Sequence, residues 1–351
     1  MNKKRSLVFM FVLVLAISIV LTGCGANQAP AASAQQQQKA EQPKEAPKTI
    51  KVGSMFSVPD PANGGGWDRA HYQGLMVLKD KYGWDVSVAE NVPYPKISET
   101  ALNYLDKGYD MIIYPDNGMI ESWKELAPQF KDNWMLMTSA VDALPDSPKV
   151  AAYAPNFYEY GNLVGIAAAK ASKTGKIGLL GGSPIPVLES LFSGVIEGAK
   201  YVNPKAEVEV YWAGDWVDTA KHREITLLEI QKGADVIFTV TGPAAKGVYE
   251  AAESKNAKVI GYCWDLYNDN PKAIMTSLML DTPTMYDEIA KDYTNGTLEK
   301  KVYDLGSKYF NFADFRGSVP ADVEKDILDT TAKFKNGEIK IPVNIHKEIM
   351  K

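Results

Sequence analysis

Short apolar segments alternate with longer helical patterns from about Lys48 over most of the chain. Strict β–α alternation predicts parallel sheets with helices on both faces. Glycines stand where several predicted helices should end, as expected of C-terminal caps: Gly83, Gly108 and Gly233. The predicted strands are 49–56, 85–92, 111–116, 134–140, 149–154, 176–182, 208–214, 236–242, 258–263 and 273–279. The predicted helices include 67–82, 97–107, 120–130, 187–202, 219–232 and 244–255.

The strands fall into two runs of about five, each the size of one doubly wound Rossmann-like lobe, with a break near 154–161. A chain of 351 residues is also longer than one core normally organises. The tail holds two further predicted helices, 282–295 and 319–335, on either side of the irregular stretch 308–318. A tail that adds to the first lobe and then returns would give three crossovers and therefore a hinge. We expect an N-terminal lobe of 49–153 with about 280–308, and a C-terminal lobe of 154–279 with about 309–345.

The first 24 residues have a basic start, an apolar run from Leu7 to Leu21 and a small-residue end, which is typical of a secretory signal. The sequence Leu-Thr-Gly-Cys that ends at Cys24 resembles a bacterial lipobox, in which cleavage leaves a lipidated N-terminal cysteine. A plain transmembrane anchor is the alternative, but the apolar run is short for a span. We therefore expect a signal peptide at 1–23 and lipidation of Cys24.

Residues 25–48 are mainly Ala, Gln, Pro and Lys, with almost nothing to bury. This composition predicts a disordered tether. Its length gives a root-mean-square reach of roughly 25–30 Å. We expect Cys24 and this tether to hold a globular body at the extracytoplasmic face of the cell membrane, where it can meet a membrane partner.

The net charge is −5, and removal of the acid-free signal with Lys3, Lys4 and Arg5 takes it to −8. An acidic surface argues against nucleic acid and anionic membrane surfaces as partners. Cys24 and Cys263 are the only cysteines, so neither a disulfide framework nor a cysteine metal site is expected. Cys263 has apolar neighbours and is expected to pack rather than react.

Ligands of open parallel sheets bind beyond the carboxyl ends of the strands. Three of the seven tryptophans fall in the loops that follow predicted strands, each with an acidic residue or Asn within two positions. Aromatic plates beside acceptors suit a flat ligand that carries N–H donors. The candidate ligand-binding residues are Trp67, Asp68, Asp116, Asn117, Trp216, Asp218, Trp264 and Asp265.

Packing roles compete with these assignments. Trp67 starts a helix, and Trp264 follows a buried strand. Trp212 alternates with Val208 and Val210, so core packing is its better interpretation and a pocket wall the lesser one. The remaining tryptophans, at element starts or on helices, are expected to pack: Trp84, Trp123 and Trp134.

The carboxylates also have structural alternatives. Asp218 could cap the helix at 219–232, and Asp116 could serve only a turn, although a cap can also face a pocket. Asp265 has no helix to cap at once, which favours a ligand or hinge role.

Catalysis has little support in the sequence. His71 and His222 lie on predicted helices and His346 lies near the end, so none stands in a site loop for nucleophilic chemistry. Phosphate-loop, dinucleotide and zinc-protease motifs are absent from the sequence. We expect no cofactor, no metal and no enzyme activity, although a carboxylate acid–base pair stays open.

Several segments resemble the basic membrane protein (BMP) family of ABC-transporter substrate-binding lipoproteins, from about Ile50 to Lys340. The resemblance implies a type I periplasmic-binding-protein fold, with two Rossmann-like lobes joined by a three-strand hinge. It also implies a monomeric receptor for a small molecule whose partner is an ABC permease–ATPase complex. The segments are NGGGWDRAHYQGL (63–75), YGNLVGIAAAKASKTGKIGLLGG (160–182), PIPVLESLFSGVIEGAKYVNP (184–204), YWAGDWVDTAKHREI (211–225), KGADVIFTVTG (232–242) and MTSLMLD (275–281).

Members of this family bind purine nucleosides, purine bases or a flavin. The nucleoside binders have a base-stacking Phe and an adjacent Asn where this chain has Trp67 and Asp68. Their ribose-binding Asp matches Asp265, but the Lys that they carry after the Thr-Ser dipeptide is absent after Ser277. The chain more closely resembles the branch that binds free bases such as adenine.

Four functions are compatible with the sequence. The first is a tethered receptor that captures a purine base or nucleoside between closing lobes for an importer. The second keeps the fold and binds a flavin or sugar, and the third is a signalling receptor. The fourth, from another class, is a nucleoside hydrolase that uses cleft carboxylates.

Overall fold

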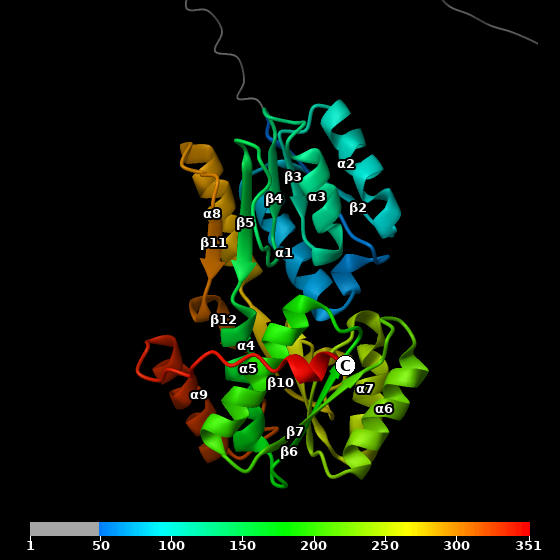
Figure 1. Cartoon of the computed structure of the whole chain (residues 1–351), viewed down its shortest axis with the longest axis vertical. Coiled ribbons are helices and arrows are strands. Elements are labelled where there is room, and N and C mark those ends of the chain that lie inside the picture. The colour runs from blue at the N-terminus through cyan, green and yellow to red at the C-terminus, as the bar shows by residue number, and fades with distance from the viewer. Residues whose placement is uncertain (1–48) are drawn as a thin grey trace, which may run out of the picture. The chain divides into compact units, whose positions relative to one another are not determined.

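The computed structural model describes residues 49–351, which form two α/β lobes (Figure 1). The N-terminal lobe is built on a sheet of order β11-β5-β4-β3-β1-β2, and the C-terminal lobe on a sheet of order β12-β10-β9-β8-β6-β7. The expected signal peptide at 1–23, the lipidation site Cys24 and the tether lie outside the described residues. None of the helices within 49–351 combines the length and apolar character that a membrane span requires.

The N-terminal sheet is parallel throughout. Helices α2 and α3 pack on one face around Trp123, and α1 and α8 pack together on the other (Figure 1). Its strands are β1 (Lys51–Met55), β2 (Asp85–Ala89), β3 (Met111–Tyr114), β4 (Trp134–Met137), β5 (Val150–Pro155) and β11 (Val302–Leu305). Its helices are α1 (Gly66–Asp80), α2 (Ile97–Asp106), α3 (Ile120–Leu126) and α8 (Thr282–Asn295).

The C-terminal sheet is parallel except at one edge, where β12 runs antiparallel to β10. Helices α4, α5 and α9 lie on one side of it and α6 and α7 on the other (Figure 1). Its strands are β6 (Lys176–Gly181), β7 (Glu207–Trp212), β8 (Val236–Val240), β9 (Lys258–Cys263), β10 (Ile274–Leu280) and β12 (Phe310–Phe312). Its helices are α4 (Phe157–Ala171), α5 (Pro186–Val202), α6 (Thr219–Gln231), α7 (Ala245–Lys255) and α9 (Ala321–Lys335).

The chain passes between the two sheets three times: after β5, after β10, and between β11 and β12. This topology confirms the predicted α/β fold with two Rossmann-like lobes and three connections. That 49–153 with about 280–308, and 154–279 with about 309–345, fold as separate units remains our proposal.

Most predicted strands run past their true carboxyl ends. The strand predicted at 111–116 ends at Tyr114, and the one predicted at 236–242 ends at Val240. Pro115 cannot donate to a ladder and Gly242 has a positive φ of 54°, so the chain leaves the sheet at these points. The helix predicted at 120–130 ends at Leu126. Ala127 still has helical angles, but Pro128 has no N–H to continue the hydrogen-bond ladder.

The prediction for the tail was wrong in part. The irregular stretch 308–318 contains β12, and β11 was not predicted, so each sheet has six strands instead of about five. Strands of three or four residues are set by pairing with β10 and β5 and leave little periodic signal in the sequence. The antiparallel edge also corrects the expectation of purely parallel sheets.

The packing predictions are confirmed where the structure tests them. Trp84 and Trp123 are buried, and Trp134 packs partly buried against the core. Cys263 is buried, and this burial raises the pKa of its thiol well above the usual range. Helix α4 packs against α5 at Gly161, where a Cβ would lie 2.1 Å from the carbonyl oxygen of Leu191.

Glu229 is an acidic residue inside the C-terminal lobe. Its side chain on α6 is 1% exposed, and neither carboxyl oxygen has a hydrogen-bond partner among residues 49–351. It lines a small cavity together with Gly178 and Lys232. Burial, followed by the charge of Glu209, raises the pKa of Glu229 well above its usual value. The folded protein therefore holds a proton here that the unfolded chain releases.

Replacing Glu229 by Gln should flatten the pH dependence of stability. Because the folded pKa is raised, wild-type stability should fall as pH rises above the unfolded value of about 4.3, by up to ~1.4 kcal/mol per pH unit until the folded pKa is reached. Denaturant unfolding between about pH 5 and pH 8 measures this. Glu224→Gln, at an exposed position of the same helix, is the control and should keep the wild-type slope. An unchanged slope in Glu229→Gln would contradict the assignment.

Candidate functional site

The start of α1 lies directly against the C-terminal lobe. A Cβ on Gly66 would lie 1.7 Å from the carbonyl oxygen of Tyr262 on β9, and a Cβ on Gly65 would lie 3.1 Å from the Cα of Gly242. Only a residue without a side chain fits at Gly66 in this arrangement. The glycine run at 64–66 thus brings the backbone of the N-terminal lobe onto the carboxyl ends of β8 and β9.

Trp67 follows directly and faces an aromatic residue of the other lobe. Its ring lies near-parallel to that of Tyr262, with an angle of 12° and 6.2 Å between centroids. Its indole Nε1 donates to the carbonyl oxygen of Pro115 at 2.8 Å, which fixes the ring beside the loop after β3. Phe157, the first residue of α4, lies 5.9 Å from Trp67, centroid to centroid. Two aromatic plates therefore meet where the lobes touch.

Tyr262 was not predicted as a site residue. It alternates with Ile260 along β9, and both contribute to the large apolar cluster that includes residues of both lobes. The signal in the sequence for Tyr262 is its position, one residue before the carboxyl end of the strand predicted at 258–263, where ligands of parallel sheets bind. The apolar pattern of the strand does not single it out, because a strand inside a parallel sheet is expected to be buried along its length.

Asp116 and Asn117 are held in the loop after β3. Asp116 accepts from the hydroxyl of Tyr94 at 2.7 Å and from the amide of Gly118 at 2.8 Å. The side-chain amide of Asn117 donates to the carbonyl of Ala140 at 2.7 Å, and its oxygen accepts from the hydroxyl of Ser139. Asn117 thus ties the loops after β3 and β4 together, while Asp116 presents a carboxylate near Trp67.

Asp68 stands in the first turn of α1. Burial raises the pKa of its carboxyl to about 7, and the carboxylate of Asp116 adds to the rise. Hydrogen bonds with backbone groups of Asp68 and Gly65 act in the opposite direction. A carboxyl that titrates near neutrality inside an interlobe site is a common mark of a functional group.

His71 lies one turn further along α1 and is fully buried. Its ring is 4.4 Å from that of Trp67, and Nδ1 lies 3.2 Å from the hydroxyls of Tyr286 and Thr138. Burial lowers the pKa of His71 to about 3, so the imidazole is neutral. Nε2 has no partner among the described residues. His71 follows Trp67 by four positions and therefore lies on the same face of α1. This spacing is a signal in the sequence for a residue behind the site.

The stretch around Trp212 and Trp216 separates into two environments. Trp212, at the end of β7, stacks on Phe192 at 5.2 Å and donates from Nε1 to the carbonyl of Ile349 at 2.5 Å, which agrees with core packing. Trp216 lies past the strand end across Gly182, and its carbonyl accepts from Ala244. Trp216 therefore sits over the carboxyl edge of the C-terminal sheet.

Asp218 serves as the cap of α6. Its side chain is exposed and accepts from the backbone amide of Lys221 at 3.0 Å. This is the structural role that competes with ligand binding, and the structure gives Asp218 no contact with Trp67 or Asp116.

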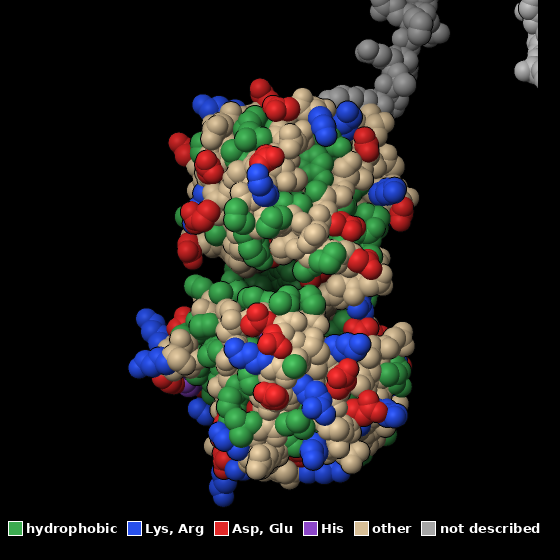
Figure 2. All heavy atoms as spheres, turned by 90° about the vertical axis from the view of Figure 1, so that its right-hand side faces the viewer, with side chains coloured by type: hydrophobic (Ala, Val, Ile, Leu, Met, Phe, Trp, Pro, Cys, Tyr) green, Lys and Arg blue, Asp and Glu red, His purple; other side chains and the backbone are tan. Residues whose placement is uncertain are grey.

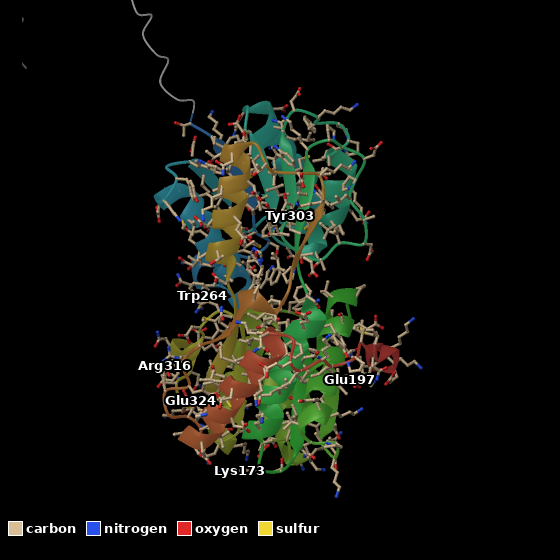
Figure 3. All side chains as sticks on the ribbon, turned by 90° about the vertical axis from the view of Figure 1, so that its left-hand side faces the viewer. Lys173, Glu197, Trp264, Tyr303, Arg316 and Glu324 are labelled. Carbon is tan, nitrogen blue, oxygen red and sulfur yellow. The ribbon has the colours of Figure 1, made fainter. Side chains whose placement is uncertain are left out.

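Trp264 and Asp265 follow β9. Trp264 packs partly buried against apolar residues of the C-terminal lobe, and Figure 3 shows it at the level where the lobes meet. Asp265 is paired with Arg316 at 2.5 Å, and the guanidinium lies 4.3 Å from the ring centroid of Tyr267. This pairing is the main contact of the Asp265 carboxylate.

Another ion pair, unlike that of Asp265, joins the two lobes. Arg69 of α1 contacts Asp269 through both guanidinium nitrogens, at 3.3 and 3.2 Å. It also donates to the carbonyls of Asn63 and Gly64. Arg69 thus fastens the start of α1 to the loop after β9.

The structure gathers Trp67, Asp68 and Asp116, adds Tyr94 and Tyr262, and leaves Asp218 and Asp265 with other partners. Figure 2 shows the surface drawn in between the lobes, with hydrophobic side chains along the hollow. Residues 49–351 contain no group of three His, Cys, Asp or Glu side chains that could hold a metal ion.

Comparison with known proteins decides the family. Residues 50–345 match the Bmp family, described as ABC transporter substrate-binding protein, PnrA-like. The chain belongs to this family. It is therefore a solute-binding protein of ABC transport, a class of binding proteins rather than enzymes that acts on the extracytoplasmic side.

Three known proteins are similar to this chain. A purine-binding protein of Brucella abortus strain 2308 is 26% identical, covering 84% of this Bmp protein and 83% of its own length. The transcriptional activator protein med of Bacillus subtilis strain 168 is 25% identical, and the match covers 83% of this chain and 91% of the length of med. The solute-binding protein of an ABC transporter from Conexibacter woesei has the same fold, with a TM-score of 0.70, 20% identity, and coverage of 85% and 100%.

Replacing Gly66 by Ala should hold the lobes of this Bmp protein apart, because its Cβ overlaps the carbonyl of Tyr262. We expect a larger radius of gyration by small-angle scattering and a ligand affinity reduced about tenfold or more. Gly64→Ala is the control, since its closest contact is Asp68 in its own lobe, at 3.2 Å. Equal scattering curves for wild type and Gly66→Ala would refute this role.

The two tryptophans of the Bmp protein should respond differently to truncation. Trp212→Ala removes a stacked, hydrogen-bonded ring from a strand and should cost about 2–4 kcal/mol of unfolding free energy. Trp216→Ala removes a loop residue whose hydrogen bond is made by its backbone, and should lower affinity with a stability loss of about 1 kcal/mol or less. Denaturant unfolding and calorimetry measure both effects, and the opposite pattern would overturn the assignment.

Proposed function

We propose that this Bmp protein captures a free purine base between its lobes and passes it to an ABC permease–ATPase complex. The observation that carries the proposal is the near-parallel pair of Trp67 and Tyr262, one from each lobe, beside the carboxyls of Asp68 and Asp116. A planar heterocycle stacks on such rings, and its N–H groups donate to the carboxyl oxygens.

The spacing of the two rings fits a closing motion. Inserting a planar ring needs about 7 Å between the flanking planes, twice a contact of about 3.5 Å. The ring centroids are 6.2 Å apart, so the lobes must separate to admit a base between the two planes. Closure then removes water from the stacked ring and strengthens its hydrogen bonds.

The ion pair between Asp265 and Arg316 favours a base over a nucleoside as the ligand. The carboxylate of Asp265, which a ribose would need, is held by Arg316, and no lysine follows Ser277 within β10. The similar protein from Brucella abortus is named a purine-binding protein. Trp216 and Trp264 would contribute further apolar wall at the carboxyl ends of the C-terminal strands.

The membrane attachment is part of the same proposal. A lipid on Cys24 and the tether that follows would keep the body within reach of the permease at the extracytoplasmic face of the cell membrane. A monomer suffices for this role, because one chain supplies both aromatic plates.

Calorimetry of the purified protein with adenine, adenosine and riboflavin tests the ligand class. We expect adenine to bind with a dissociation constant below about 10 μM and more tightly than the other two. Trp67→Ala and Tyr262→Ala should each weaken adenine binding about 10- to 100-fold, since an aromatic–base stack is worth about 1–3 kcal/mol. Tyr201→Ala, at an exposed aromatic position, is the control. Failure of all three compounds to bind below about 10 μM would refute the purine proposal.

A signalling role is the second candidate, because a relative of similar coverage is named as a transcriptional activator. The two roles predict different effects of gene deletion. A transport role requires loss of purine uptake, whereas a signalling role requires an altered transcriptional response with uptake intact.

A further inference from the structure

Two carboxyl groups from different elements lie beside the aromatic pair. Asp68 belongs to the first turn of α1, and Asp116 follows β3. The bond from Trp67 Nε1 to the carbonyl of Pro115, at 2.8 Å, joins the residues that directly precede the two carboxylates. This bond holds the loop that carries Asp116 beside the first turn of α1, and the charge of Asp116 acts on Asp68.

Among residues 49–351, the basic side chains next to this pair either have another partner or are neutral. Arg69, next to Asp68, is turned to Asp269 and to the carbonyls of Asn63 and Gly64. His71 is buried and neutral. Tyr94 from η2 (Tyr94–Lys96) donates its hydroxyl to Asp116, and Tyr262 is the ionisable residue that faces the pair from β9.

Two like charges in a partly desolvated site do not both ionise easily. Burial raises the pKa of Asp68 to about 7, and the charge of Asp116 contributes to this. Tyr94 and Gly118 donate hydrogen bonds to Asp116, whereas burial outweighs the backbone hydrogen bonds of Asp68 and raises its pKa, so Asp68 is the member that carries the proton.

We propose that Asp68 and Asp116 hold one proton between them at neutral pH and thereby select a base whose edge places one acceptor beside one donor, as adenine does. This inference rests on the proposed function. It adds which edge of the base is recognised and how the affinity depends on protonation of the site.

The selection follows from hydrogen-bond chemistry. A protonated carboxyl donates one hydrogen bond and accepts others, whereas an ionised carboxylate only accepts. The six-membered ring of adenine presents a ring nitrogen acceptor beside an amino donor, which matches the protonated Asp68. Guanine presents two adjacent donors, which match an ionised carboxylate. Raising the pH should therefore weaken adenine binding and strengthen guanine binding.

Calorimetry of the wild-type protein at about pH 6 and pH 8.5 tests the inference. With one linked proton that titrates near pH 7, adenine affinity should fall about 30-fold over this range, and guanine affinity should rise. Binding of adenine at the higher pH should take up close to one proton, measured as the dependence of the binding heat on the ionisation enthalpy of the buffer. This measurement needs no variant.

Asp68→Asn supplies the matched variant, because its amide keeps one donor and one acceptor but does not titrate. Adenine affinity in this variant should stay within about threefold between the two pH values. Asp106→Asn, at an exposed carboxyl of α2, should keep the wild-type 30-fold change.

The outcomes separate this inference from the function on which it rests. Adenine binding with a flat pH profile and no proton uptake would overturn the proton-sharing pair while leaving the purine receptor in place. A full pH dependence in Asp68→Asn would also overturn it. Absence of purine binding at both pH values would overturn the proposed function and this inference together.

Discussion

The contact between Gly66 and the carbonyl of Tyr262 is the constraint on which the site depends. Because no side chain intervenes, α1 begins directly against the end of β9. Trp67 is then placed over Tyr262, and Arg69 reaches Asp269 of the other lobe. A glycine run in a loop looks like simple flexibility, but here it permits one specific backbone contact between two sheets. The aromatic pair and the ion pair both follow from that contact.

The end of β9 is held from behind by Tyr160. Cys263 has a φ of 62°, which is uncommon for a residue with a side chain and requires support from its surroundings. The hydroxyl of Tyr160 accepts from the amide of Cys263 and donates to the carbonyl of Leu278. Tyr160 lies on α4, just after the first passage between the sheets, and Leu278 lies on β10, before the second. One buried hydroxyl therefore links the site to two of the three connections.

Periodicity predicted the β–α order and most helix bounds, because helices covering a parallel sheet must alternate with apolar strands. The short strands β11 and β12 escaped, since their conformation depends on partners far away in sequence. In the site, the rule that ligands bind beyond the carboxyl ends of parallel strands predicted Trp67, Asp68 and Asp116, which lie in one region of the structure. The same reasoning could not foresee that Arg316 pairs with Asp265, because those residues are 51 positions apart. Nor could it pair Trp67 with Tyr262, since a contact between lobes leaves no periodic signal.

The charges around the site also restrict the class of ligand. Arg69 and Arg316 contact its loops, and each is bound to a carboxylate of the C-terminal lobe. An anionic ligand, such as a phosphorylated nucleotide, would meet the carboxyls of Asp68 and Asp116 and would have to draw an arginine away from its partner. Displacing Arg69 would in addition break a contact that holds the lobes together. In the proposed binding mode a neutral heterocycle would lose nothing of this kind, because its ring would stack between Trp67 and Tyr262 while its N–H groups would meet oxygen acceptors. These two ion pairs, one of which joins the lobes, therefore favour an uncharged base over a nucleotide.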